Sequence, residues 1–364
     1  MLNYEEYAFQ RWHGTLIAIL NVALVSTFNI VGVRFLPLVE TFALILHLAG
    51  FFAYIIPVWV MGESSPGSVI WTEFLNEGGW ASIGGSTLVG LITPVTALIA
   101  SDCCCHLSEE LRNASKSLPR AMLATLVVNG SLGLITAITF AYHAGDLEEL
   151  LSTPTGFPFI QLYYNATGSK AGTTAMTSIV ICLALFNAIA NVAASSRQLF
   201  AFARDRGFPF HKFFGSAPQE GVVKEVPLNA ILFTSLVSGA LACINIGSTV
   251  ALNQIFSLGL TALLSSYLVS TGCIALKRIR GERLLSAHFV LSKRSGLLIN
   301  MIGLAFAALA LVTAFFPPIN HPQPATMNWA ILVYGTVVLF SIVYYLIVGR
   351  HRYEGPVAYV RKLE

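Results

Sequence analysis

Apolar runs long enough to cross a membrane as helices recur along this chain, separated by short polar segments. A helix of about 20 residues crosses a hydrocarbon core about 30 Å thick. A soluble protein of this size would show amphipathic stripes instead. The boundaries set by charged residues, Pro and Gly predict nine spans, at 14–34, 38–61, 84–103, 121–142, 174–203, 228–246, 251–276, 297–316 and 328–349.

The composition agrees with this pattern. Of the 364 residues, 55% are hydrophobic and 11% are charged, whereas soluble domains carry about 25% charged residues. The mean hydropathy is +0.71. We therefore expect an all-α polytopic membrane protein of about nine transmembrane helices, with the lipid bilayer as its surroundings and no nucleic-acid partner. The opening residues lack the basic region and cleavage site of a signal peptide, so the first span itself acts as the membrane signal.

Basic residues gather in alternate loops. They follow the third, fifth and seventh spans and close the chain, whereas residues 62–83 carry no Lys or Arg and 143–173 carry only Lys170. The positive-inside rule therefore predicts a cytosolic C-terminus and an N-terminus outside. The glycosylation sequon at Asn165 falls in a predicted outer loop. An odd number of spans with the N-terminus outside fits two interpretations: a true nine-span protein, or one that has lost an odd number of spans at its front.

The third run ends in the stretch DCCCHLSEELRNASKSLPRAM, which begins at Asp102. A carboxylate inside a span costs about 2.5–3.5 kcal/mol on insertion scales and normally faces protein or a water-filled cavity. Pro94 interrupts the backbone hydrogen bonds of the same run, and transporters build substrate sites from interrupted helices. In one interpretation Ile99 to Asp102 is an unwound part of a substrate cavity. In the other, Asp102 caps a short cytosolic helix and Pro94 makes a simple kink. Pro119 is expected to end the cytosolic segment before the next span.

The cysteines do not predict a metal site. Cys103, Cys104 and Cys105 are consecutive, so on a helix they point in three directions and cannot all bind one ion. Packing or reversible palmitoylation suits them better. We expect no metal, no cofactor and no disulfide framework. An enzyme is not expected either, because no Ser/His/Asp set, HExxH motif or phosphate-binding glycine loop is evident.

Several motifs together resemble one family. HLSEELRNASKSLPRAM is similar to the loop after the sixth span of fungal amino acid, GABA and choline permeases of the amino acid, polyamine and organocation superfamily. ASSRQLFAFARDRGFPF, followed by VPLNAI, resembles the end of the eighth span and the start of the next. GFFAYIIPVWVM and FLNEGGWASIG resemble the fifth span and the outer loop before the sixth. The resemblance covers nearly the whole chain.

This resemblance implies a fold of twelve helices, in which the first ten form two inverted five-helix repeats. Residues 1–364 would then be one permease domain, its nine spans equivalent to helices four to twelve. Within it, 14–61 is the remainder of the first repeat, 84–276 the second repeat and 297–349 the last two helices. The first three helices are expected to be missing, and partner helices would then cover the faces left open.

The implied function is secondary active transport of an amino acid, GABA, choline or a related small amine, across the plasma or vacuolar membrane. Proton coupling is expected from most fungal relatives, although no residue here identifies a proton carrier. The alternative is a transport-incompetent remnant, or a regulatory partner of a full-length permease. These alternatives differ in whether this chain alone moves substrate.

The family holds its substrate between the broken first and sixth helices. The predicted substrate-binding residues are Ile99, Ala100, Ser101, Asp102, Asn187 and Asn191. The two asparagines share one helix face, where they line the cavity or bond a neighbouring helix. The family tends to place a Gly shortly before the acidic residue. Ile suits an unwound stretch less well than Gly, which predicts a different backbone geometry at Ile99.

Overall fold

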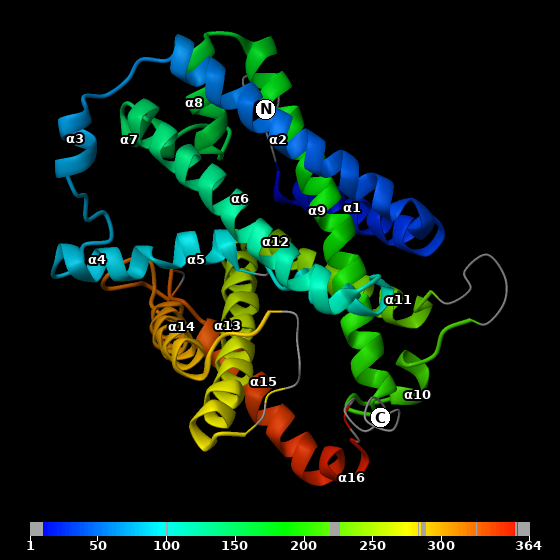
Figure 1. The fold of residues 1–364 in the computed structure, drawn as a ribbon. Helices are drawn as coiled ribbons and strands as arrows, with labels where there is room; N and C mark the ends of the chain where they lie inside the picture. The colour runs from blue at the N-terminus through cyan, green and yellow to red at the C-terminus, as the bar shows by residue number, and fades with distance from the viewer. Residues whose placement is uncertain are drawn as a thin grey trace. The chain divides into compact units, whose positions relative to one another are not determined.

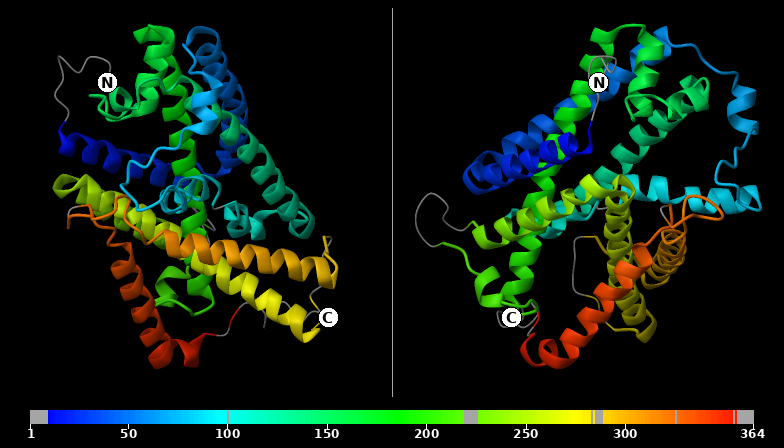
Figure 2. Two further views of the ribbon diagram at one scale, coloured as in Figure 1. Left: turned by 90° about the vertical axis from the view of Figure 1, so that its left-hand side faces the viewer. Right: turned by 180° about the vertical axis from the view of Figure 1, so that it is seen from behind.

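The computed structural model describes residues 10–99, 101–218, 226–282, 284, 289–324, 326–353 and 355. Within these ranges the secondary structure is helical and no strand occurs. Nine helices among the described residues are long and apolar enough to cross a membrane. The predicted all-α polytopic class is therefore confirmed (Figures 1 and 2). The chain forms two compact units, Met1–Glu73 with Asn129–Ile246 and Phe74–Val128 with Gly247–Glu364.

Helices from separate parts of the chain build each unit, and α6 and α12 run from one unit into the other. The first unit holds α1 (Arg11–Val31), η1 (Val33–Phe35), α2 (Leu36–Met61), α3 (Gly67–Thr72), α7 (Leu147–Leu151), α8 (Pro158–Thr167), α9 (Lys170–Arg204), α10 (His211–Phe214), α11 (Leu228–Ala242), most of α12 (Ile244–Gly247) and the second half of α6 (Ala114–His143). The second unit holds α4 (Ile83–Gly90), α5 (Ile92–Leu98), η2 (Cys103–Glu110), the first half of α6, α13 (Thr249–Arg280), α14 (Lys293–Thr313), α15 (Ala330–Tyr344), the π-helical turn η3 (Tyr345–Gly349) and α16 (Arg350–Arg352).

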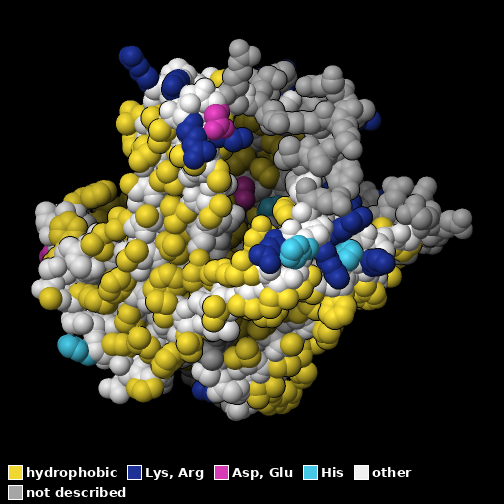
Figure 3. All heavy atoms as spheres, turned by 90° about the horizontal axis from the view of Figure 1, so that it is seen from below, with side chains coloured by type: hydrophobic (Ala, Val, Ile, Leu, Met, Phe, Trp, Pro, Cys, Tyr) yellow, Lys and Arg dark blue, Asp and Glu magenta, His cyan; other side chains and the backbone are white. Residues whose placement is uncertain are grey.

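Many large apolar side chains are exposed, as a bilayer requires. Val60 is 76% exposed and Leu236 is 71% exposed. Figure 3 shows one face with many hydrophobic side chains at the surface, on which Lys and Arg gather in a few places. In water such a surface would drive aggregation, whereas lipid tails solvate it.

The long helix α9 organises the first unit by packing against α1, α2, α8 and α11. The amide of Asn29 in α1 donates to the carbonyl of Ile189 in α9 at 3.1 Å. The hydroxyls of Ser26 in α1 and Ser235 in α11 lie 2.5 Å apart. Since lipid gives apolar helices no reason to associate, such interhelical hydrogen bonds and small-residue contacts hold membrane helices together.

At Gly50, α2 lies directly against α9. A Cβ atom placed on Gly50 would lie 2.6 Å from Cγ2 of Ile179 in α9. No side chain fits at that distance unless the helices move apart. Gly50 therefore sets the spacing of this helix pair.

A different core holds the second unit together. Leu260 and Leu264 of α13 pack with Ala310 of α14 and with Ala314, the residue directly after the end of α14. Ile92, Val95 and Ile99 pack against the same cluster, so α5 lies on the pair formed by α13 and α14. The hydroxyls of Ser265 in α13 and Tyr334 in α15 lie 2.6 Å apart and connect the third long helix of the unit.

Two predicted spans differ in detail. The span predicted at 84–103 lies within the candidate membrane span Ile83–Ser108, in which α4 and α5 meet at Leu91 and α5 ends at Leu98. Pro119 was expected to precede a span, but it lies inside α6, which begins at Ala114. Pro119 lies past the first turn of α6, so it removes one backbone hydrogen bond of the helix without ending it.

We predict that Gly50→Leu destabilises the protein. The added side chain would collide with Ile179, and overpacking of this kind costs about 1–3 kcal/mol. The thermal midpoint of the detergent-solubilised protein, followed by size-exclusion chromatography after heating, should fall.

Gly133→Leu is the matched control, because a Cβ atom at Gly133 of α6 meets no atom within 4 Å. It should leave the midpoint unchanged or raise it slightly, since Leu has the higher helix propensity. Equal losses for the two variants would contradict the assigned role of Gly50.

Candidate functional site

The third apolar run is broken where α5 ends. Ile99 leaves the helix with φ −68° and ψ 164°, an extended conformation. Asp102 returns to helical angles, and the 3-10 helix η2 begins directly after it. The interruption therefore lies within the predicted segment, of which Ala100 is outside the described residues.

The geometry at Ile99 corrects one expectation. Its φ is negative, so the position does not need the conformational freedom of glycine. Extended backbone suits a β-branched residue. The side chain also packs against the cluster containing Leu264. Isoleucine therefore fits this break and anchors it, whereas glycine would offer no side chain to pack.

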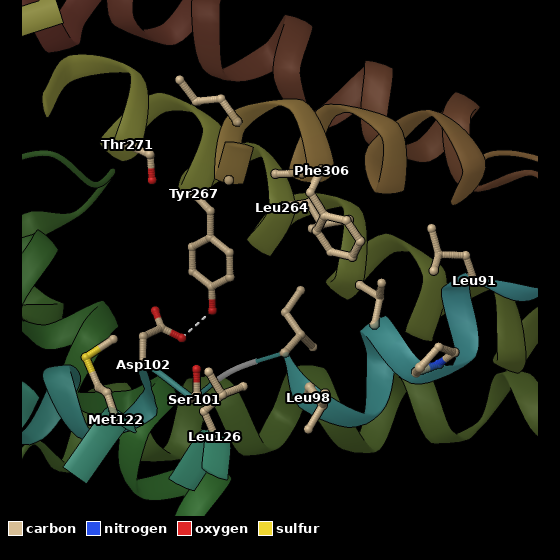
Figure 4. Close-up of a pocket in the computed structure, with 16 residues that line it drawn as sticks. Leu91, Leu98, Ser101, Asp102, Met122, Leu126, Leu264, Tyr267, Thr271 and Phe306 are labelled. Carbon is tan, nitrogen blue, oxygen red and sulfur yellow. Dashed lines mark hydrogen bonds between the residues drawn. The ribbon is translucent and has the colours of Figure 1, made fainter. Parts of the chain in front are cut away.

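Asp102 uses its side chain to reach another helix. Its Oδ1 accepts a hydrogen bond from the hydroxyl of Tyr267 in α13 (Figure 4). Asp102 occupies the N-cap position of η2, yet its side chain makes no capping hydrogen bond. The backbone carbonyl of Asp102 already accepts from the amide of Cys105 at 2.7 Å. The interpretation of Asp102 as a cap is therefore wrong, because the main chain satisfies the turn and leaves the carboxylate to Tyr267.

A cavity of about 490 Å³ surrounds this pair. Its walls come from α5, the break, the first half of α6, α13 and α14, all within the second unit. The lining residues are Leu91, Pro94, Val95, Leu98, Ile99, Ser101, Asp102, Met122, Leu126, Leu264, Tyr267, Thr271, Gly303, Leu304, Phe306 and Ala307. Asp102 is the only one of these lining residues that carries a charge.

The cavity has a polar end and an apolar end. Figure 4 shows the hydroxyl of Tyr267 at the carboxylate of Asp102, with Ser101 beside it and Thr271 one helical turn further along α13. Met122 and Leu126 also lie at this end, whereas Leu91, Leu98, Leu264 and the ring of Phe306 lie at the other end. In a cavity with so few polar groups, the carboxylate acts on a ligand with little screening. This arrangement suits a small molecule with one cationic group and an apolar body.

The predicted site residues fall into two sets. Ile99, Ser101 and Asp102 line the cavity together. Asn187 and Asn191 belong to the first unit, where both are exposed on α9. The amide of Asn191 donates to the backbone carbonyl of Asn187 at 3.0 Å and to its side-chain oxygen at 3.1 Å. These bonds run along α9 itself and not to a neighbouring helix.

Helix α13 contributes residues to the cavity that were not predicted from the sequence. Leu264, Tyr267 and Thr271 lie three and four residues apart, so they share one face of the helix and line the cavity together. A hydroxyl inside an apolar run needs a hydrogen-bond partner. This requirement could have marked Tyr267 as a residue with a polar partner. The sequence does not indicate which helix supplies that partner.

The three neighbouring cysteines lie beside the cavity. Cys103, Cys104 and Cys105 are half-buried and form no disulfide. The Sγ atom of Cys105 lies 3.7 Å from Sδ of Met122, a cavity residue. Within the part of the chain that the structure describes, no group of three or more His, Cys, Asp or Glu side chains could hold a metal ion.

Comparison with known proteins gives consistent results. The amino acid permease family model matches residues 1–338. The chain is 30% identical over 332 residues to a protein named as an amino acid/polyamine transporter from Macrophomina phaseolina, covering 90% of this chain and 72% of the relative. It is 32% identical over 339 residues to an uncharacterised amino-acid permease of Schizosaccharomyces pombe, with 91% and 61% covered. It is 26% identical over 360 residues to a choline transporter of Saccharomyces cerevisiae, with 97% and 62% covered. The chain thus spans between 61% and 72% of the length of these three relatives.

Proposed function

Because the chain belongs to the amino acid permease family, we propose that it carries out secondary active transport of an amino acid, GABA, choline or a related small amine. It is an integral multi-pass membrane protein and a permease, not an enzyme. The observation that carries the substrate class is the cavity in which Asp102 is the only charged lining residue. A single carboxylate in apolar surroundings favours a cation.

The cavity and the broken helix together suit the binding and transport of a cationic substrate. An ammonium group that enters loses its hydration, and the carboxylate of Asp102 compensates that loss. Leu98 and Phe306 receive the apolar body of the substrate at the other end. Transporters of this kind expose a central site alternately to the two sides of the membrane. The break between α5 and η2 is the point at which the backbone can change direction without breaking helical hydrogen bonds.

We propose that the protein lies in the plasma or vacuolar membrane with its C-terminus in the cytosol, coupled to protons. Asp102 is the residue that would hold the cationic group of the substrate. Asn187 and Asn191 of α9 remain weaker candidates for the same pathway.

Replacing the carboxylate tests the function directly. We predict that Asp102→Asn strongly reduces uptake of labelled substrate at subsaturating concentration in permease-deficient cells, while membrane abundance stays unchanged. A hydrogen bond to a charged group contributes about 1.5–3 kcal/mol, so binding should weaken about 10- to 100-fold.

Asp146→Asn is the control for the same chemical change. Asp146 caps α7 by accepting from the amide of Glu148 at 2.9 Å, and Asn caps equally well. Unaltered uptake by Asp102→Asn would remove Asp102 from the site. No saturable uptake by the wild-type chain alone would favour the alternative of a remnant or a regulatory partner.

Filling the apolar end should narrow the substrate range. Leu98→Trp adds volume to a lining residue, and we predict that it reduces uptake of bulky substrates more than that of small ones. Leu88→Trp is the control, because Leu88 is exposed on α4 and does not line the cavity. Similar losses of uptake for substrates of all sizes would show that the apolar part of the substrate does not bind at this end.

Glycosylation tests the proposed sides of the membrane. Asn165 is exposed near the end of α8, and we predict that it carries a glycan. Endoglycosidase treatment should increase gel mobility, and Asn165→Gln should remove that shift. A shift that disappears only with Ser115→Ala, which destroys the sequon Asn113-Ala114-Ser115 on the predicted cytosolic side, would reverse the assigned sides.

A further inference from the structure

The polar end of the cavity is built by two different parts of the second unit. Ser101 and Asp102 come from the break after α5, and Tyr267 and Thr271 come from α13. We propose that these four side chains form a site for a primary ammonium group, and that Tyr267 and Thr271 determine its specificity. The inference rests on the proposed function. It adds that the site selects substrates by the number of N–H donors on their ammonium group.

The direction of one hydrogen bond sets the chemistry of this end. The hydroxyl of Tyr267 donates its proton to Oδ1 of Asp102, because an ionised carboxylate can only accept. Beyond that bond, the phenol oxygen can only accept. The polar end is therefore rich in acceptor oxygens, and its complement is a group that donates hydrogen bonds.

The charge of the cavity decides which end of a substrate enters here. None of the lining residues that the structure describes is Lys or Arg. A carboxylate placed beside Asp102 would be repelled without a cation to offset it. The ammonium group therefore faces Asp102 and the rest of the molecule extends towards Phe306.

The number of donors separates primary from quaternary ammonium groups. A primary ammonium has three N–H donors, which matches the cluster of oxygens around Asp102. A quaternary ammonium has none, so it would desolvate these oxygens without pairing them. Quaternary groups bind instead in cages of aromatic rings. Only Tyr267 and Phe306 contribute rings among the described lining residues, and Phe306 lies at the apolar end.

The chain offers a matched control for Tyr267. Tyr334 of α15 also bonds through its hydroxyl to α13, at Ser265. Tyr334 does not line the cavity around Asp102. Tyr334→Phe therefore removes a comparable phenol hydrogen bond from the same helix without changing the cavity.

The experiment measures binding of two probes to the purified full chain in detergent. The probes are n-butylammonium and n-butyltrimethylammonium, which share a body and a charge but differ in N–H donors. Binding is read from competition against a labelled substrate and from ligand-induced thermal shift. The wild type should prefer n-butylammonium by about tenfold or more, as expected for the loss of hydrogen bonds to a charged group.

Tyr267→Phe and Thr271→Val should each reduce this preference several-fold by weakening n-butylammonium binding. Tyr334→Phe should preserve it. Thr271→Val keeps the shape of the side chain, so the test does not depend on one variant that fails to fold. Equal binding of both probes by the wild type, or an unchanged ratio in both cavity variants, would overturn this inference alone. Binding of neither probe would overturn the proposed function together with it.

Discussion

A carboxylate at the end of a membrane-spanning run has to be compensated, and in this protein the compensation is the hydrogen bond from Tyr267 to Asp102. The bond joins the break in the third run to the middle of α13. Once that connection exists, the walls follow, because α5 packs on α13 and α14 through their shared apolar cluster. The cavity is thus the space that remains around one satisfied charge.

The two units use different means of holding helices together. The first unit relies on close approach at Gly50 and on polar bonds such as that of Asn29 to α9. The second has a core of leucine and alanine and places its polar side chains around a cavity. Close packing leaves no room for a ligand, whereas looser packing around a charge creates it. The two units therefore differ because different residue types lie at their helix contacts.

Sequence reasoning predicted the spans well, because the length of an apolar run directly reflects the thickness of the membrane. The resemblance to fungal permeases also led to the correct family. Local rules failed where a tertiary contact decided the outcome. The side chain at Asp102 could have capped η2, and only its contact with Tyr267 shows that it does not. Pro119 looked like a boundary, yet α6 continues through it. Tyr267 was overlooked because its partner lies 165 positions away in the sequence.

The extended conformation at Ile99 has a consequence for the cost of binding. A glycine at this break would sample many backbone conformations in the empty protein, and ligand binding would have to select one of them. A β-branched residue whose side chain is packed against the α13 and α14 cluster samples few. Ile99 is then held in place before any ligand arrives. Little conformational entropy remains to be lost on binding, so a weak set of contacts suffices to hold a small solute that must later be released.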